Sequence, residues 1–186
     1  LRGSGSKDFY GRAPVGEVFE LRANQGVIAY EPTELVVTVR GGTPLAELEA
    51  MLAAQGQYLA FEPPHFGAGA TVAGCVAAGL SGPRRVTAGA VRDFMLGVKV
   101  LDGRGQVMRF GGQVMKNVAG YDVSRLIAGS LGTLGIVLEV SLKVLPRPVA
   151  AATLSFELDE ATAIRRVNEW GGQPLPVSAT LWQDGV

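Results

Sequence analysis

Two glycine-rich segments are the parts of this sequence whose residue types and spacing could do chemistry, and that chemistry would be anion binding. In the first, residues 2–7, alternating glycines allow successive N–H groups to converge on one anion, and serine hydroxyls add further donors. A pyrophosphate is the ligand that we expect there. Glycine–serine repeats are also typical of flexible linkers, and the residues alone leave both interpretations open. The candidate residues are Arg2, Gly3, Ser4, Gly5, Ser6 and Lys7.

The second segment, residues 67–82, carries almost only small side chains. A ligand could therefore lie directly on its backbone, whose N–H groups would bind phosphate without a charged side chain. A face for tight helix packing is the alternative, and the composition fits both interpretations. The candidate residues in this segment are Gly69, Ala70, Thr71 and Gly74.

The chain has one histidine and one cysteine, which excludes several classes of site. A single histidine rules out a two-histidine metal site. A single cysteine rules out a disulfide framework, a cysteine-based zinc site and an iron–sulfur cluster held by this chain alone. We therefore expect no metal. His65 is more typical of a local structural hydrogen bond than of catalysis, Cys75 is typical of a small buried hydrophobic residue, and no catalytic base is assigned.

Two further motifs concentrate polar or glycine residues. Residues 116–122 (Lys-Asn-Val-Ala-Gly-Tyr-Asp) could carry polar chemistry or form a loop that ends in a helix cap. Residues 129–137 place three glycines at a spacing of three before a strand, which also fits the end of a helix and a turn. The phosphate-loop, Rossmann, GxSxG, HExxH and CxxC motifs are absent from the sequence, which argues against the common nucleotide-binding and hydrolase classes.

Composition excludes other classes of function. Hydrophobic residues make up 47% of the chain and charged residues 18%, which excludes intrinsic disorder for most of it. Lys+Arg and Asp+Glu both number 17, so the basic excess typical of a nucleic-acid binder is missing. The apolar runs are interrupted well short of the ~20 residues that a membrane span requires. We expect a cytoplasmic protein with no integral membrane segment.

Hydrophobic periodicity predicts a first unit of mixed strands and helices. Thr43 is predicted to cap a helix that has Pro44 at its first position and closes at Gly56. Asp122 is predicted to cap a short helix that runs to Ala128. Strands are expected over residues 27–30, 35–40, 58–61, 95–101, 106–110 and 136–145, with a hairpin turn at 102–105.

A second unit is expected after Pro146 and Pro148, which interrupt the chain. It would comprise a strand over 153–158, a helix over 159–170 and a strand over 177–183. We predict a domain boundary near residue 148, with a second piece too small to fold alone. Because the sequence begins with Leu1 and ends in an apolar segment, we also expect it to be part of a longer protein.

The order of the motifs carries more information than any one of them. The sequence Gly-Thr-Pro-Leu at 42–45, the small residues at 69–74, Val-Arg-Asp at 91–93 and the glycines at 129–137 follow the first loop in turn. Over residues 1–147 this order resembles the FAD-binding domain of the vanillyl-alcohol oxidase/p-cresol methylhydroxylase (PCMH) superfamily. Three more specific stretches, at 2–11, 80–85 and 115–122, are similar to the FAD-binding E subunits of glycolate oxidases.

The resemblance implies a fold and a set of cofactor contacts. The fold would be α+β, of the PCMH type, with FAD between two α+β subdomains over residues 1–147 and the start of a cap domain over 148–186. The two glycine-rich segments would hold the pyrophosphate through backbone donors. The ring edge would receive a hydrogen bond from the backbone of Ile136. Further cofactor-binding positions would be Pro64, Val72, Ala78, Ser81 and Gly82.

The sequence departs from the superfamily pattern at four places. Val72 and Ala73 stand where the common motif reads Ile-Gly, and Gly79 stands where an asparagine is common. Leu138 stands where a threonine is usual. Leu131 stands where catalytic subunits usually carry an acid.

By resemblance, the protein would be an FAD-dependent oxidoreductase subunit that oxidises the 2-hydroxy acid glycolate to glyoxylate. Electrons would leave through an iron–sulfur partner, and a sister FAD subunit would belong to the same hetero-oligomeric complex, which could associate peripherally with a membrane. The alternative is a non-catalytic FAD-binding subunit with a structural or electron-relay role. A glycine-rich packing domain without a cofactor would explain each motif alone but not their order.

Overall fold

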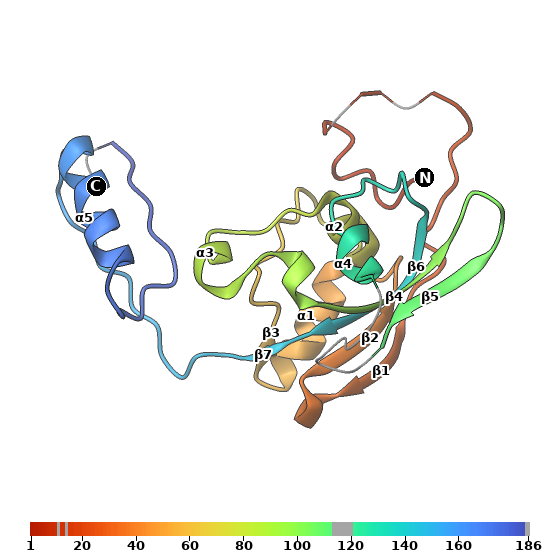
Figure 1. The fold of residues 1–186 in the computed structure, drawn as a ribbon, viewed down its shortest axis with the longest axis horizontal. Coiled ribbons are helices and arrows are strands. Elements are labelled where there is room, and N and C mark those ends of the chain that lie inside the picture. Colours follow the sequence, from red (N-terminus) through yellow and green to blue (C-terminus); the bar gives the residue numbers. More distant parts are fainter. Residues whose placement is uncertain (11, 14, 113–120, 185–186) are drawn as a thin grey trace.

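A five-stranded antiparallel sheet forms the centre of the computed structural model, which describes residues 1–10, 12, 13, 15–112 and 121–184 (Figure 1). Its strands lie in the order β1-β2-β6-β4-β5, so β6, which comes last of these five in the sequence, occupies the middle. They are β1 (Val27–Glu31), β2 (Val36–Arg40), β6 (Ile136–Lys143), β4 (Met95–Leu101) and β5 (Val107–Gly111). A separate two-stranded sheet pairs β3 (Gln57–Tyr58) with β7 (Leu145–Pro146).

The helices α1, α2 and α4 pack their buried residues into the core on one face of the large sheet. The α-helices are α1 (Leu45–Ala54), α2 (Val72–Ala78), α3 (Arg85–Ala88), α4 (Val123–Ile127) and α5 (Glu160–Gly171), with 3-10 turns at Pro32–Glu34 and Val91–Phe94. This mixture of helices with an antiparallel sheet confirms the α+β class. Among the described residues, no helix has both the length and the apolar character that a bilayer crossing needs.

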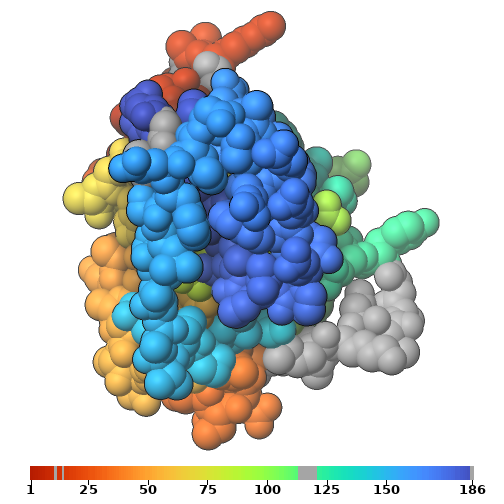
Figure 2. Space-filling view, turned by 90° about the vertical axis from the view of Figure 1, so that its left-hand side faces the viewer, coloured from red at the N-terminus to blue at the C-terminus, as the bar shows by residue number. Residues whose placement is uncertain are grey.

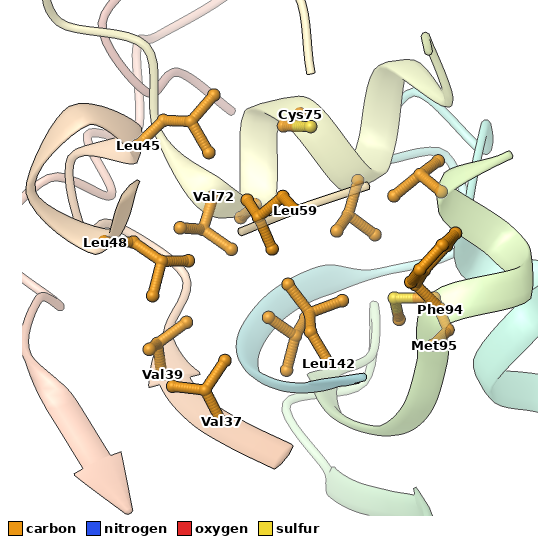
Figure 3. Close-up of a cluster of buried hydrophobic side chains, with 14 of the residues drawn as sticks. Val37, Val39, Leu45, Leu48, Leu59, Val72, Cys75, Phe94, Met95 and Leu142 are labelled. Atoms are coloured by element: carbon orange, nitrogen blue, oxygen red, sulfur yellow. The ribbon is translucent and has the colours of Figure 1, made fainter. Parts of the chain in front are cut away.

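The core lies between the sheet and the first two α-helices (Figure 3). Leu45, Leu48 and Leu52 recur at spacings of three and four along α1, so they form one buried stripe of that helix. Cys75 on α2 is 2% exposed and belongs to the same cluster, which confirms its interpretation as a small buried hydrophobic residue. The buried face of α2 consists of Val72, Ala73, Cys75 and Val76.

The opposite face of the sheet is polar, as alternation along the strands requires. Thr38 and Ser141 lie opposite one another on β2 and β6, and their hydroxyl oxygens are 2.8 Å apart. Glu139 accepts hydrogen bonds from Lys99 Nζ at 2.9 Å and from Arg109 Nη2 at 3.2 Å. These three side chains lie on three adjacent strands and tie them together.

The structure corrects the predicted start of the first helix. Pro44 occupies the N-cap position and the helix begins at Leu45, one residue later than expected. The Thr43 hydroxyl donates to the carbonyls of Arg40 at 2.7 Å and Gly26 at 3.2 Å, so it closes the turn after β2 instead of capping α1. The strand expected over 58–61 is also shorter than predicted, because only β3 pairs with a neighbour.

The C-terminal part stands apart from the sheet, as Figure 1 shows, and Figure 2 views the molecule from that side. Asp159 caps α5 by accepting a hydrogen bond from the Thr162 N–H at 2.9 Å, as predicted. The strands expected over 153–158 and 177–183 are wrong, since no strand is assigned in those residues. A strand needs a neighbour for its hydrogen bonds, and neither segment pairs with another in the described chain.

Candidate functional site

The two glycine-rich segments, far apart in the sequence, lie against each other. A side-chain Cβ built on Gly3 would lie 2.8 Å from Thr71 Oγ1, and one built on Gly69 would lie 3.0 Å from Ser4 Cβ. Gly67 approaches Ser6 in the same way. We call residues 2–7 the N-terminal loop and residues 66–71 the central loop. Their close approach depends on residues that carry no side chain at the contact.

The N-terminal loop is tied to its surroundings by specific contacts. Arg2 donates its N–H to the Phe19 carbonyl and accepts from the Leu21 N–H, both at 2.9 Å, in a short parallel bridge. A turn follows, in which the Asp8 N–H donates to the Gly5 carbonyl at 3.0 Å, and the Arg2 guanidinium pairs with Asp8 at 2.6 Å. These contacts favour a folded loop over the linker interpretation.

The central loop is tied to both of the first two helices. The Leu45 N–H donates to the Ala70 carbonyl at 2.7 Å, and the Val72 N–H donates to the Thr43 carbonyl at 3.0 Å. Thr71 caps α2 by accepting a hydrogen bond from the Gly74 N–H at 3.2 Å. The sequence had left open whether this segment is a packing face or a ligand surface. Its α2 part packs into the core, whereas the preceding loop leaves backbone exposed.

Unpaired N–H groups gather in these two loops. In the part of these loops that the structure describes, eight backbone N–H groups have no hydrogen-bond acceptor: Gly3, Ser4, Gly5, Lys7, Gly67, Ala68, Gly69 and Thr71. Backbone donors are obligatory hydrogen-bonding groups, so water or a ligand must satisfy them. A multiply charged oxyanion would suit such a set of donors.

The charge around the loops favours an anion. The Lys7 ammonium lies 5.9 Å from the centre of the Phe66 ring and pairs with no carboxylate among the described residues. Phe9 packs edge-on against the same ring, with centroids 5.2 Å apart. Sequence reasoning did not single out this aromatic pair, and the only signal for it was the position of Phe66 next to Gly67.

Cys75 lies behind the loops and does not serve as a nucleophile. Burial raises the pKa of its thiol to about 12, an effect that the Lys7 charge opposes and the Glu49 charge reinforces. The thiol therefore stays protonated near neutral pH, and a protonated thiol is a poor nucleophile. His65 Nε2 lies 2.8 Å from Glu49 Oε2. This contact confirms the expectation of a local structural hydrogen bond for the histidine.

The positions assigned by resemblance are placed as follows. Ser81 Oγ accepts a hydrogen bond from the Val91 N–H at 3.0 Å, and the Gly82 N–H donates to the Phe61 carbonyl at 2.9 Å, so both hold the chain after α2 in place. Pro64 and Ala78 are half-buried. Ile136 opens β6 opposite Leu101 of β4, within the sheet.

The glycine motif at 129–137 comes to the end of α2. The N–H groups of Gly129 and Leu131 donate to the carbonyls of Val76 and Ala77, at 3.0 and 2.9 Å. A Cβ on Gly132 would lie 3.3 Å from the Leu1 side chain, so this turn also reaches the N-terminal segment. Of the motif at 116–122, residues 116–120 lie outside the described residues. Its last residue, Asp122, caps α4 as predicted.

A family model described as "FAD binding domain" matches residues 1–111. The chain belongs to this FAD-binding family. It is 51% identical over all of its 186 residues to "Glycolate oxidase subunit GlcE" of Escherichia coli (strain K12), of which it spans 53%. It is 32% identical over 155 residues, or 82% of the chain, to "Glycolate oxidase subunit GlcD" of Bacillus subtilis (strain 168), of which it spans 33%.

Among solved structures, an alkyldihydroxyacetonephosphate synthase matches 70% of this chain with a TM-score of 0.59 and 27% identity, over 23% of its own length. The predicted resemblance, the α+β fold of the FAD-binding family and the assignment of FAD as the cofactor are thereby confirmed. The chain spans about half the length of its Escherichia coli relative and a smaller share of the others named here.

Proposed function

We propose that this chain is the FAD-binding part of a glycolate oxidase subunit and that the N-terminal and central loops hold the pyrophosphate of the cofactor. The observation that carries the proposal is the contact between these two glycine-rich loops, whose unpaired N–H groups face no acceptor in the described chain. The identity to a glycolate oxidase subunit over the full chain supports the same assignment.

The residues present fit a pyrophosphate. Backbone N–H groups supply the donors, Lys7 supplies an unpaired positive charge, and the glycines leave room for oxygen atoms to approach the backbone. Arg2 contributes less charge, because Asp8 already pairs with it. The side chain of Ser4 accepts only a long hydrogen bond, at 3.4 Å from the Ser6 N–H, so its hydroxyl stays available as a donor.

The chemistry that a bound FAD would supply is the removal of a hydride from the α-carbon of a 2-hydroxy acid, which, with loss of the hydroxyl proton, turns glycolate into glyoxylate. The residues of this chain would bind and orient the cofactor, and we assign none of them as the catalytic base. Electrons would leave through a partner that carries iron–sulfur clusters, because one cysteine cannot ligate a cluster. A sister FAD subunit, a cytoplasmic location and peripheral membrane association through partners belong to the same proposal.

Residues 148–186 would begin a second, substrate-covering domain. The segment that contains α5 stands away from the sheet in Figure 1 and reaches the main body through a hydrogen bond from Thr87 Oγ1 to the Ser178 carbonyl, at 3.2 Å. This sparse contact supports a domain boundary near residue 148. The preceding residues, 1–147, would form the cofactor-binding domain.

A second function is favoured by Leu131. This residue is 54% exposed and apolar. By the resemblance to the superfamily, catalytic subunits usually carry an acid at this position. A subunit without that acid could bind FAD as a structural or electron-relay component while a sister subunit oxidises the substrate. Both functions require FAD on this chain, and they differ in whether glycolate reduces it.

The test is an absorbance spectrum of the purified protein reconstituted with FAD, before and after anaerobic addition of glycolate. A stoichiometric flavin that bleaches supports the oxidase, and one that stays oxidised supports the relay function. Gly69→Val should abolish FAD binding, because its side chain would fill the space against Ser4. Gly103→Val is the matched control, since a Cβ there meets nothing within 4 Å. Stoichiometric FAD in the Gly69 variant would contradict the site.

A further inference from the structure

The chain before the central loop is conformationally strained. Glu62 and Phe66 both adopt left-handed backbone conformations, with φ of 50° and 52°, although neither is glycine. Such conformations persist only where the surroundings hold them. Residues 62–66 therefore need anchors outside their own backbone, and two side-chain pairs provide them.

The first anchor holds Glu62. Its carboxylate accepts from the Arg84 backbone N–H at 3.0 Å and from Arg84 Nε at 2.8 Å, so one residue grips both of its oxygens. Gly82 also packs against Glu62, and a Cβ at that glycine would lie 2.6 Å from Glu62 Cβ. The upstream end of the strained segment is thus fixed to the chain after α2.

The second anchor is the pair formed by His65 and Glu49, whose side chains are about one-third exposed. Glu49 lies on α1, four residues after Leu45. Leu45 itself holds the far end of the central loop through its N–H bond to the Ala70 carbonyl. The helix α1 therefore anchors the chain at His65 through the Glu49 side chain and at Ala70 through a backbone N–H.

Between His65 and Ala70 lie the residues that contact the N-terminal loop. Phe66 packs against Lys7 and Phe9, and Gly67 and Gly69 approach serines of that loop. Within the described chain, the one backbone hydrogen bond inside this stretch runs from the Ala70 N–H to the Gly67 carbonyl at 3.2 Å. The placement of the stretch thus depends on the anchors at its ends.

We propose that His65 and Glu49 form a positioning latch that holds the central loop against the N-terminal loop. The proposal rests on the proposed function, because it concerns how firmly the same loops retain FAD. A hydrogen bond to a carboxylate is charge-assisted and is stronger than a bond between two neutral groups. Glu62, Tyr58 and Arg147 line the same hollow as the pair.

The expected consequence is that FAD binding depends on the pair. Glu49→Gln replaces the carboxylate by a neutral amide, and His65→Gln removes the imidazole ring. Each variant should raise the dissociation constant of the full chain for FAD, measured by flavin fluorescence at one pH, about three- to tenfold.

The double variant tests the coupling of the two residues. It should bind FAD no more weakly than either single variant, because each substitution already opens the latch. Glu20→Gln is the matched control, since it removes an exposed ion pair with Arg22 at 3.0 Å and should leave the dissociation constant unchanged. An unchanged dissociation constant in both single variants, or an equal effect of the control, would overturn the latch.

A second measurement is independent of FAD. Phe66 is 52% exposed, and chymotrypsin should cleave after it about three to ten times faster in Glu49→Gln than in the parent chain at pH 6, because the loop opens more often. Equal cleavage rates would refute the latch even if the protein binds FAD. A parent chain that binds no FAD at all would instead refute the proposed function, while the cleavage assay would still decide the latch.

Discussion

Gly5 offers the sharpest test of whether the N-terminal loop binds phosphate through its backbone. It has φ of +75°, and a Cβ there would lie 2.6 Å from Arg2 Nη2 and 2.9 Å from Asp8 Oδ2. The left-handed conformation costs a non-glycine residue about 1–2 kcal/mol, and the exposed Arg2–Asp8 pair is worth up to about 1 kcal/mol. Gly5→Val should therefore weaken FAD binding by about 1–3 kcal/mol, or roughly five- to 150-fold in the dissociation constant.

Two comparisons give this result its meaning. Ser4→Ala removes a hydroxyl that accepts only a 3.4 Å hydrogen bond, so we expect a loss of about 0.5 kcal/mol, or roughly twofold. Gly105→Val introduces the same kind of strain, at φ of +78°, in the hairpin turn between β4 and β5, where a Cβ meets nothing within 4 Å. That variant should lose stability but keep its affinity for FAD.

Flavin fluorescence titration measures the three dissociation constants, and circular dichroism checks that each variant is folded. Negligible and equal losses in the Gly5 and Ser4 variants would refute phosphate binding by the N-terminal loop and leave the central loop as the remaining candidate. A loss in the Gly105 variant as large as that in the Gly5 variant would show that strain acts through global stability. Either outcome would contradict the reasoning from loop geometry.

Two further predictions concern the core. Leu48 is 1% exposed, so Leu48→Ala should lower the free energy of unfolding, measured in urea, by about 2–5 kcal/mol. Leu154 is 76% exposed, so Leu154→Ala should change that free energy little. Equal effects of the two substitutions would contradict the packing described. Because burial raises the pKa of Cys75 to about 12, the native thiol should resist iodoacetamide at pH 9 and react once urea unfolds the chain. The folded state then holds a proton that the unfolded chain releases, so stability should fall as pH rises above about 9, and rapid labelling of the native protein would argue against this.

Local patterns allowed the regular elements to be predicted from the sequence. The leucine spacing of α1 reflects one buried face, and the partial alternation over 136–145 is typical of a strand; both leave a periodic trace in the sequence. The partner of Thr43 could not be predicted in this way, because Gly26 reaches it from another part of the chain. The strands expected over 153–158 and 177–183 failed because their residues suit a strand but lack a neighbour to pair with.

The candidate site was predicted only in part. The glycine content of each loop pointed to exposed backbone, and the order of the motifs, through resemblance, pointed to FAD. The contact between Gly69 and Ser4 and the anchoring of His65 by Glu49 are tertiary, and no single-sequence pattern encodes them. The two loops could therefore be named from the sequence, but their meeting could not.

The position of β6 in the middle of the sheet has a consequence for how the protein is made. Thr38 and Ser141 pair across β2 and β6 although they are 103 residues apart, so the ribosome releases β2 and β4 long before the strand that joins them. During that interval both strands present open edges, which are templates for pairing with other chains. A polypeptide that ended at residue 111 would keep those edges permanently. The nascent protein is therefore exposed to aggregation until about thirty further residues are made and β6 is complete.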